Sequence, residues 1–313
     1  MATSLTLNRP RQTAGKRPGR TLWKALEAYV FILPSFLGVL IFIAFPVFFA
    51  LYMSTQNWDG ISQPFFVGLK NYQDLLGDTI FWISLRNTLV YTLITMPIGV
   101  VISLGIAILL NQKVRGLVFF RTAMFIPVVT SALAISVIWK WIYDFDNGLI
   151  NDLLQAIHLS AVPWLSDPTW ALIGVSIIGI WQGFGFTTII ILAALQNIPE
   201  SLLDAASIDG ARGWTRFWYI TLPLIAPTLL FVTVISFVGS FQVFTQVYYI
   251  TDGGPDYGTS VLNFLVFRRA FRENTFGSAA ALSYVMFAII FIVTMIQLRI
   301  SRNAVNAAAE IDA

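Results

Sequence analysis

Asp204-Ala205-Ala206-Ser207-Ile208-Asp209-Gly210, followed after nine residues by Ile220-Thr221-Leu222-Pro223, is the stretch that decides how this chain folds. It joins two segments that are apolar enough to cross a lipid bilayer. Pro199 suits the first turn of a helix, and Gly210 can adopt the left-handed conformation that ends one. We therefore predict a short helix between these two residues, a second at about 212–219, and a membrane span that opens at Pro223.

The two alanines give the first short helix little side chain. Small residues let a helix approach another protein closely, and the charges of Asp204, Arg212 and Arg216 can fix the register of such a contact. The alternative is an amphipathic helix that lies on the membrane surface. Helix physics alone does not decide between the two.

The composition is that of a membrane protein. Of the 313 residues, 57% are hydrophobic and 11% are charged, whereas globular domains have about 25% charged residues. The chain has no cysteine, which excludes disulfides and thiolate metal sites. The net charge is +3, but the basic residues gather in one tail and in loops, so we expect no nucleic-acid partner.

Both ends of the chain are predicted to be cytoplasmic tails. Residues 1–27 carry Arg9, Arg11, Lys16, Arg17, Arg20 and Lys24 among prolines and glycines. Such a segment cannot bury enough apolar surface to offset its chain entropy, so we expect it to be disordered and to touch anionic lipid headgroups. Residues 303–313 are expected to form the second tail.

The fold class is predicted to be all-α, a polytopic membrane bundle with six transmembrane helices within residues 28–302. A span needs roughly 20 apolar residues, and its backbone groups must be satisfied within the segment. The expected spans cover about 29–53, 88–110, 122–142, 170–195, 224–250 and 277–298.

The basic residues of the loops predict the orientation. One side carries the basic tail, Lys113, Arg115, Arg121, Arg212, Arg216, Arg299 and Arg302. The other side carries Lys70, Arg86, Lys140, Arg268, Arg269 and Arg272, offset by a larger number of acidic residues. We expect the first side, and with it both termini, to face the cytoplasm.

The middle of each expected span lacks Asp, Glu and His. Ion-coupled pumps accept the cost of such groups because they need them, so their absence counts against the rival class, an ion-gradient-driven secondary transporter of a small polar solute. The polar residues inside the spans are neutral, such as Gln182, Thr187 and Ser236. Neutral donors and acceptors suit an uncharged, hydroxyl-rich solute.

The spacing of the opening stretch resembles the cytoplasmic signature of the permeases of binding-protein-dependent ABC importers, with Asp204 where that family usually has Glu. Three further motifs are similar to external loops of the carbohydrate-uptake type, in particular the first permease of maltose, lactose and glycerol-phosphate systems. These motifs are Phe66-Val67-Gly68-Leu69-Lys70-Asn71-Tyr72, Asn147-Gly148-Leu149-Ile150-Asn151, and Thr251-Asp252-Gly253-Gly254-Pro255 with Thr259. The resemblance covers about 28–302.

The resemblance implies a multi-pass permease subunit in the cytoplasmic membrane of a prokaryote. It implies a heterodimer with a second permease, two ATP-binding subunits, an extracytoplasmic solute-binding protein, and contact with membrane lipid. The implied solute is a di- or oligosaccharide or a related polyol derivative, moved by alternating access. ATP and magnesium are expected on the partner ATPase, because this chain lacks the Gly-x-x-x-x-Gly-Lys-Ser/Thr loop and is not expected to be an enzyme.

The resemblance also implies two sets of site residues. The loop at about 197–222 would couple to the ATPase through Asp204, Ala205, Ala206, Asp209, Gly210, Arg212, Ile220 and Pro223. Solute would contact Gln182, Gly183, Phe186, Ser236, Gly239 and Ser240. The alternative for the second set is packing between helices, where small and polar residues are also common. The single histidine, His158, has no companion ligand, so we predict no catalytic residue and no metal site.

Overall fold

The computed structural model describes residues 18–112 and 116–311, with side chains for residues 29–112 and 116–300. Most of the expected basic tail, together with Lys113 and Arg115, therefore lies outside the described residues. The chain divides into two units, residues 1–52 and 53–313. Helices make up most of both, as the all-α prediction requires.

The first unit is one long helical run. It consists of α1 (Pro18–Val39), the π-helical turn η1 (Leu40–Ala44) and most of α2 (Phe45–Ser54). The run begins at Pro18, a residue that the first turn of a helix tolerates, and so extends into the segment that we expected to be disordered. Large side chains such as Phe31 and Phe42 are exposed along it, so this helix needs an apolar environment.

The second unit contains a short hairpin and thirteen further helical elements within the described residues. The hairpin pairs β1 (Gln56–Asn57) with β2 (Phe65–Phe66) in antiparallel register. The helical elements are α3 (Lys70–Gly77), α4 (Thr79–Leu110), α5 (Leu117–Val129), α6 (Ala132–Ile142), α7 (Leu149–Ala156), α8 (Pro168–Gln196), α9 (Glu200–Ile208), α10 (Trp214–Arg216), η2 (Phe217–Thr221), α11 (Leu222–Phe241), η3 (Val247–Thr251), α12 (Leu262–Phe271) and α13 (Phe276–Ile311).

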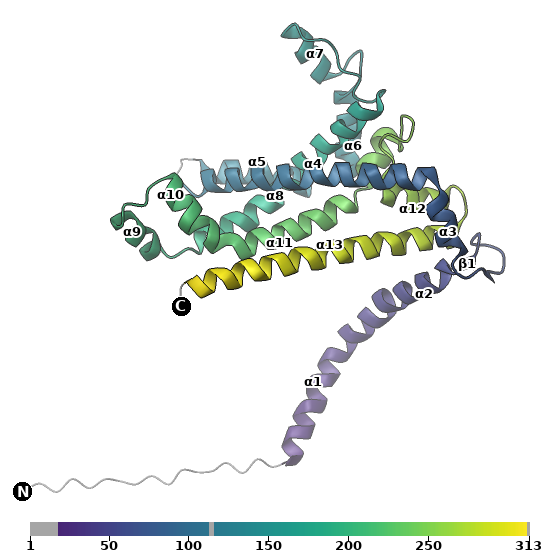
Figure 1. Cartoon of the computed structure of the whole chain (residues 1–313), viewed down its shortest axis with the longest axis horizontal. Coiled ribbons are helices and arrows are strands. Elements are labelled where there is room, and N and C mark those ends of the chain that lie inside the picture. Colours follow the sequence, from purple (N-terminus) through teal and green to yellow (C-terminus); the bar gives the residue numbers. More distant parts are fainter. Residues whose placement is uncertain (1–17, 113–115, 312–313) are drawn as a thin grey trace, which may run out of the picture. The chain divides into compact units, whose positions relative to one another are not determined.

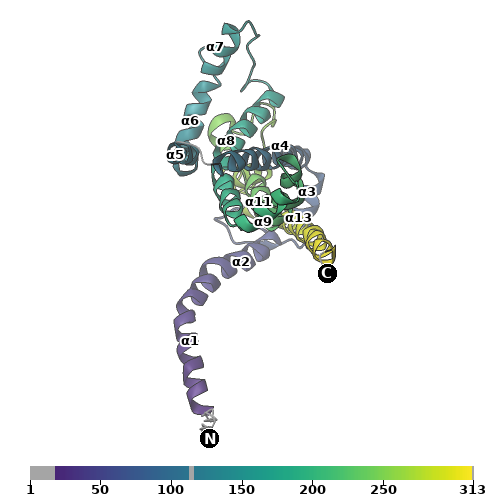
Figure 2. The same ribbon diagram turned by 90° about the vertical axis from the view of Figure 1, so that its left-hand side faces the viewer.

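Four long helices form the bundle of this unit. Figures 1 and 2 show α4, α8, α11 and α13 packed along one another. Phe81, Phe241 and Leu282 are buried where α4, α11 and α13 meet, and Ala107 and Ile191 are buried between α4 and α8. The helix α9 and the carboxyl end of α13 lie at one end of the bundle, whereas α3 and α12 lie at the other (Figure 1).

Five helical runs of the described residues are long and apolar enough to cross a membrane, and a bent pair raises the number to as many as six. The bent pair is α5 with α6, whose axes differ by 97°. The predicted span over 122–142 is therefore not one continuous helix but a helix pair with a sharp bend. Pro127 removes a backbone hydrogen bond near the end of α5, and Thr130 takes an extended conformation that ends the helix.

The predicted span over 224–250 is also wrong at both of its ends. The helical run already begins at Trp214, because α10 and η2 lead directly into α11. Pro223 therefore does not open the span, and the predicted helix at 212–219 is part of the same run. At the other end α11 stops at Phe241, and η3 begins only at Val247. In η2 the N–H of Leu222 bonds the carbonyl of Phe217, an irregular turn directly before Pro223.

Candidate functional site

The short helix α9 ends as the sequence predicts. Gly210 has φ +85°, the left-handed conformation that glycine adopts without strain. The N–H of Ala211 donates to the carbonyl of Ala206 at 2.9 Å, and the N–H of Gly210 donates to that of Ser207 at 3.3 Å. These two bonds are the pair that terminates many helices with a glycine. They fix the direction in which the chain leaves α9.

The two alanines of α9 lie in different surroundings. Ala206 is only 6% exposed and faces the protein, whereas Ala205 is exposed. Asp204, Asp209 and Arg212 are exposed as well, and the described part of the chain offers none of them an ion-pair partner. The outward face of α9 therefore combines one small residue with unpaired charges.

Exposed apolar side chains next to α9 were not predicted. Ile208 at its carboxyl end is 86% exposed, and Trp214 and Tyr219 are exposed in the segment that follows. The indole of Trp214 packs edge-on against that of Trp218, with 5.6 Å between ring centroids. Of the remaining predicted coupling residues, Ile220 is half-buried and Pro223 is exposed. Large exposed apolar patches mark surfaces that contact another protein or lipid.

A cavity of about 400 Å³ lies between α4, α8 and α11. All six predicted solute-contacting residues line it, namely Gln182, Gly183 and Phe186 from α8 and Ser236, Gly239 and Ser240 from α11. The structure thus brings together two groups that are about 50 residues apart in the chain. The volume of the cavity falls within the usual range of small-molecule sites, about 300–1,000 Å³.

The interruption after α11 forms part of the cavity wall. Gln242, Val243 and Phe244 all line the cavity and lie between α11 and η3. The side chain of Asn263 on α12 donates to the carbonyl of Gln242 at 2.8 Å. Non-helical backbone inside a membrane is tolerated where it lines a cavity. The cavity therefore explains how the chain can be interrupted between α11 and η3.

The polar side chains that line the cavity are neutral, and only some of them make hydrogen bonds to other residues. Gln246 donates to Gln182 at 2.6 Å, and the hydroxyl of Ser240 donates to the carbonyl of Ser236 within α11. The exposed ring of Phe186 supplies an apolar face. Among residues that sequence reasoning missed, Tyr91 and Thr95 of α4 also line the cavity. Their helix carried no motif that pointed to a site.

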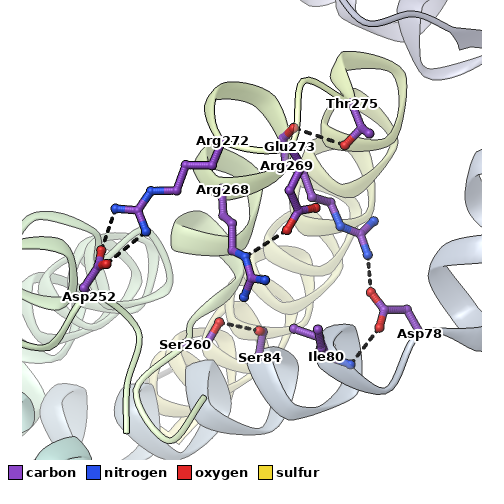
Figure 3. Close-up of polar contacts among 10 residues, drawn as sticks. All are labelled: Asp78, Ile80, Ser84, Asp252, Ser260, Arg268, Arg269, Arg272, Glu273 and Thr275. Carbon is purple, nitrogen blue, oxygen red and sulfur yellow. Dashed lines mark hydrogen bonds and ion pairs between the residues drawn. The ribbon is translucent and has the colours of Figure 1, made fainter. Parts of the chain in front are cut away.

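The opposite end of the bundle is held together by polar contacts (Figure 3). The guanidinium of Arg269 on α12 pairs with Asp78, whose other oxygen accepts the N–H of Ile80 at 2.8 Å and caps α4. Arg272 binds both oxygens of Asp252 at 2.9 and 2.7 Å, and this hydrogen bonding raises the pKa of Arg272 above its ordinary value. These pairs join α12 to α4 and to the loop after η3.

The Gly-Gly-Pro loop is closed by two threonines. The hydroxyls of Thr251 and Thr259 are 2.7 Å apart, and that of Thr259 donates to the carbonyl of Gly254 at 2.7 Å. Further along, the hydroxyls of Ser84 on α4 and Ser260 are 2.9 Å apart (Figure 3). The motif therefore orders a loop at the end of the bundle away from α9.

The other two loop motifs also have a structural role. Asn71 donates from its side chain to the carbonyls of Ser54 and Gln56, both at 2.8 Å, and so ties α3 to the hairpin. Asn151 is fully buried and bonds the main chain of Phe145 and Val162 as well as the indole N–H of Trp164. Each asparagine holds a loop in place, which explains the residue type at that position.

The comparison with known proteins identifies the family. Residues 13–306 match the family described as binding-protein-dependent transport system inner membrane component, and the chain belongs to it. It is a multi-pass protein of a prokaryotic membrane. The chain is 35% identical over 281 residues to the probable ABC transporter permease protein YesP of Bacillus subtilis, covering 88% of this chain and 90% of the relative.

A second relative is similar to this chain in sequence, and a solved structure is similar to it in fold. The chain is 34% identical over 284 residues to the lactose transport system permease protein LacF of Rhizobium radiobacter, covering 89% of this chain and 95% of that protein. Its fold is similar, with a TM-score of 0.81 and 21% identity, to a chain of a bacterial alginate ABC transporter crystallised with an alginate pentasaccharide-bound periplasmic protein. That comparison covers 93% of this chain and 99% of the other.

Proposed function

We propose that this chain is the transmembrane permease subunit of an ATP-driven importer for an uncharged di- or oligosaccharide or a related polyol. The observation that carries the proposal is the cavity, because its polar side chains are all neutral and lie beside the exposed ring of Phe186. Amides and hydroxyls can bond the hydroxyls of a sugar, and an aromatic face can pack against its ring. The relatedness to a lactose permease supports the same solute class.

The proposal includes an orientation and a set of partners. Arg212 and Arg216 lie near α9, and by the positive-inside rule they support a cytoplasmic location for that end of the bundle. A second permease would complete a heterodimer, two ATP-binding subunits would carry ATP and magnesium, and an extracytoplasmic protein would deliver the solute. The surface formed by Asp204, Ala205 and Ile208 on α9 would be the docking site for an ATP-binding subunit.

The way α9 is connected to the cavity supports the proposal of alternating access. The chain runs from α9 through Gly210 and a short loop into the helical run that ends at the cavity. A displacement of α9 by the ATPase would tilt that run and change the opening of the cavity. Solute from the extracytoplasmic side would enter while the ATP-binding subunits are closed and leave to the cytoplasm when they separate.

The test is transport by the assembled complex in proteoliposomes. Labelled lactose, maltose and trehalose serve as probes, with the solute-binding protein outside and ATP inside. We expect accumulation of at least one of them that requires hydrolysable ATP. Uptake that continues without ATP and disappears with an ionophore would contradict the proposal, and so would ATP-driven uptake of an ion in place of all three sugars.

A further inference from the structure

A tyrosine of α4 lies against the cavity without being one of the expected contacts. Tyr91 is 3% exposed and packs with Leu172, Val175 and Val243. It nevertheless lines the cavity, together with Thr95 one turn further along the helix. A third helix therefore contributes to a wall whose expected residues come from α8 and α11.

The ring of Tyr91 is buried, but its hydroxyl is not among the enclosed oxygens without a partner, and it makes no hydrogen bond to any described residue while its side chain lines the cavity. Buried tyrosine hydroxyls nearly always have a partner. The buried Tyr143 and the half-buried Tyr72 both have such a partner. The hydroxyl of Tyr143 donates to the carbonyl of Gly174 at 3.0 Å, and that of Tyr72 donates to the hydroxyl of Ser54 at 2.8 Å.

Gly179 on α8 makes room for this hydroxyl. A Cβ atom at position 179 would overlap the Tyr91 hydroxyl and lie 3.1 Å from Cζ of the same ring. The absence of a side chain at position 179 thus lets the phenol reach across to α8. Gln182 and Gly183 lie on the next turn of α8 and also line the cavity. The unpartnered hydroxyl is therefore held beside the polar groups of the expected solute site.

We propose that the Tyr91 hydroxyl hydrogen-bonds a hydroxyl group of the transported solute and makes α4 a third recognition helix. The inference rests on the proposed function, because it needs a hydroxyl-rich solute in the cavity. A neutral phenol can both donate to and accept from a sugar hydroxyl. Because the Tyr91 hydroxyl gives up no bond within the protein when the solute binds, the net gain is that of one hydrogen bond exchanged for a bond to water, about 0.5–1.5 kcal/mol.

The test compares two tyrosine-to-phenylalanine variants in the complete transporter in nanodiscs. Tyr91→Phe removes the unpartnered hydroxyl, and Tyr143→Phe removes one that bonds the protein. Binding of lactose, maltose and trehalose is measured by saturation-transfer NMR, which detects weak binding directly at the membrane subunits. Thermal stability is measured in parallel.

We expect Tyr91→Phe to raise the dissociation constant of the bound sugar about five- to tenfold, the effect of one lost hydrogen bond, without lowering thermal stability. Tyr143→Phe should lower thermal stability and leave the dissociation constant unchanged. Among monodeoxy analogues of the bound sugar, one should bind both the wild type and Tyr91→Phe equally well, because it lacks the hydroxyl that Tyr91 contacts.

Unchanged affinity in Tyr91→Phe would overturn the inference, as would a loss of stability equal to that of Tyr143→Phe. Ser236→Ala separates this failure from a failure of the proposed function. If Ser236→Ala weakens sugar binding and Tyr91→Phe does not, the cavity is the solute site and only the role of Tyr91 is wrong. If the wild type binds none of the three sugars, the proposed solute class is wrong and the inference with it.

Discussion

The side-chain amide of Gln246 donates a hydrogen bond of 2.6 Å to the side-chain oxygen of Gln182. Gln182 lies on α8, and Gln246 lies just before η3, beyond the interruption that follows α11. The bond therefore connects the two sides of the cavity at its polar wall. Gln182 is one of the predicted solute contacts, so under the proposed function a solute hydroxyl would compete with Gln246 for the side-chain oxygen of Gln182.

Replacing either glutamine should reveal this connection. We expect Gln246→Leu and Gln182→Leu each to reduce the free energy of unfolding by about 1 kcal/mol, because each leaves the other amide without its partner. The double variant should cost less than the sum of the two, with a coupling of about 0.5–1.5 kcal/mol. Thermal unfolding of the four proteins in one detergent measures this coupling, and strict additivity would show that the two amides act independently.

Gly210 should tolerate only residues that accept its backbone conformation. Pro fixes φ near −65° and removes the N–H that bonds Ser207, both incompatible with φ +85°. We expect Gly210→Pro to abolish ATP-driven uptake and solute-stimulated ATP hydrolysis while the spans still insert. Gly210→Asn is the matched control, since Asn enters the left-handed region most readily among residues with a side chain, and it should retain most of the uptake. Wild-type uptake in Gly210→Pro would remove the coupling role from α9.

The two neighbouring alanines should respond differently to a bulky side chain. Ala205 is exposed, so Ala205→Trp should leave the free energy of unfolding within about 0.5 kcal/mol and prevent copurification of the ATP-binding subunit. Ala206 is buried, so Ala206→Trp should destabilise the protein by about 1–3 kcal/mol through overpacking. Ala205→Ser serves as the small control and should still copurify. Loss of the ATP-binding subunit only in Ala206→Trp would place the docking surface elsewhere.

The ion pairs opposite α9 should differ in their contribution to stability. The side chain of Arg269 is 9% exposed and that of Asp78 is 28% exposed, whereas Arg272 and Asp252 are 41% and 56% exposed. Breaking a fully buried pair reduces the free energy of unfolding by about 3–5 kcal/mol. The pair between Arg269 and Asp78 is partly exposed, so we expect Asp78→Asn to reduce it by about 2 kcal/mol. Asn keeps a side-chain oxygen that can still cap α4. Asp78→Ala also loses the cap and should cost about 1 kcal/mol more.

The exposed pair provides the comparison. Asp252→Asn should change the free energy of unfolding by less than about 1 kcal/mol, because both side chains are solvated. Denaturation of the three variants in one buffer measures the order. An Asp252→Asn variant that is less stable than Asp78→Asn would mean that the α12 contacts to the loop after η3, rather than those to α4, hold this end of the bundle.

The sequence predicted those features that depend on local chemistry or on average hydropathy. Long apolar runs identify membrane helices because the bilayer demands about 20 such residues. Gly210 could be assigned as a helix end because few other residues adopt its conformation. The residues of α8 and α11 around the cavity came from the family resemblance, and the structure places all six of them on one cavity.

The interruptions of the spans could not be predicted in the same way. The apolar character of 122–142 and 224–250 continues through the breaks, so hydropathy does not register them. Gln242 ends α11 in a tertiary contact, the hydrogen bond from Asn263. Pro127 weakens the end of α5, but a proline does not by itself mark a break, because Pro97 lies inside the continuous helix α4. Tyr91 escaped attention for a similar reason, since a tyrosine in an apolar helix usually packs in the core, and only the absent partner of its hydroxyl distinguishes it.

Under the proposed coupling, the helical run from Trp214 to the cavity would make α11 a lever arm. Its 20 residues, Leu222–Phe241, measure about 30 Å along the helix axis at 1.5 Å per residue. A tilt of about 5° at the end near α9 moves the other end by about 3 Å, roughly the length of one hydrogen bond. Since α11 ends just before the segment that carries Gln246, a displacement of α9 by the proposed ATP-binding subunit would act close to the bond between Gln246 and Gln182.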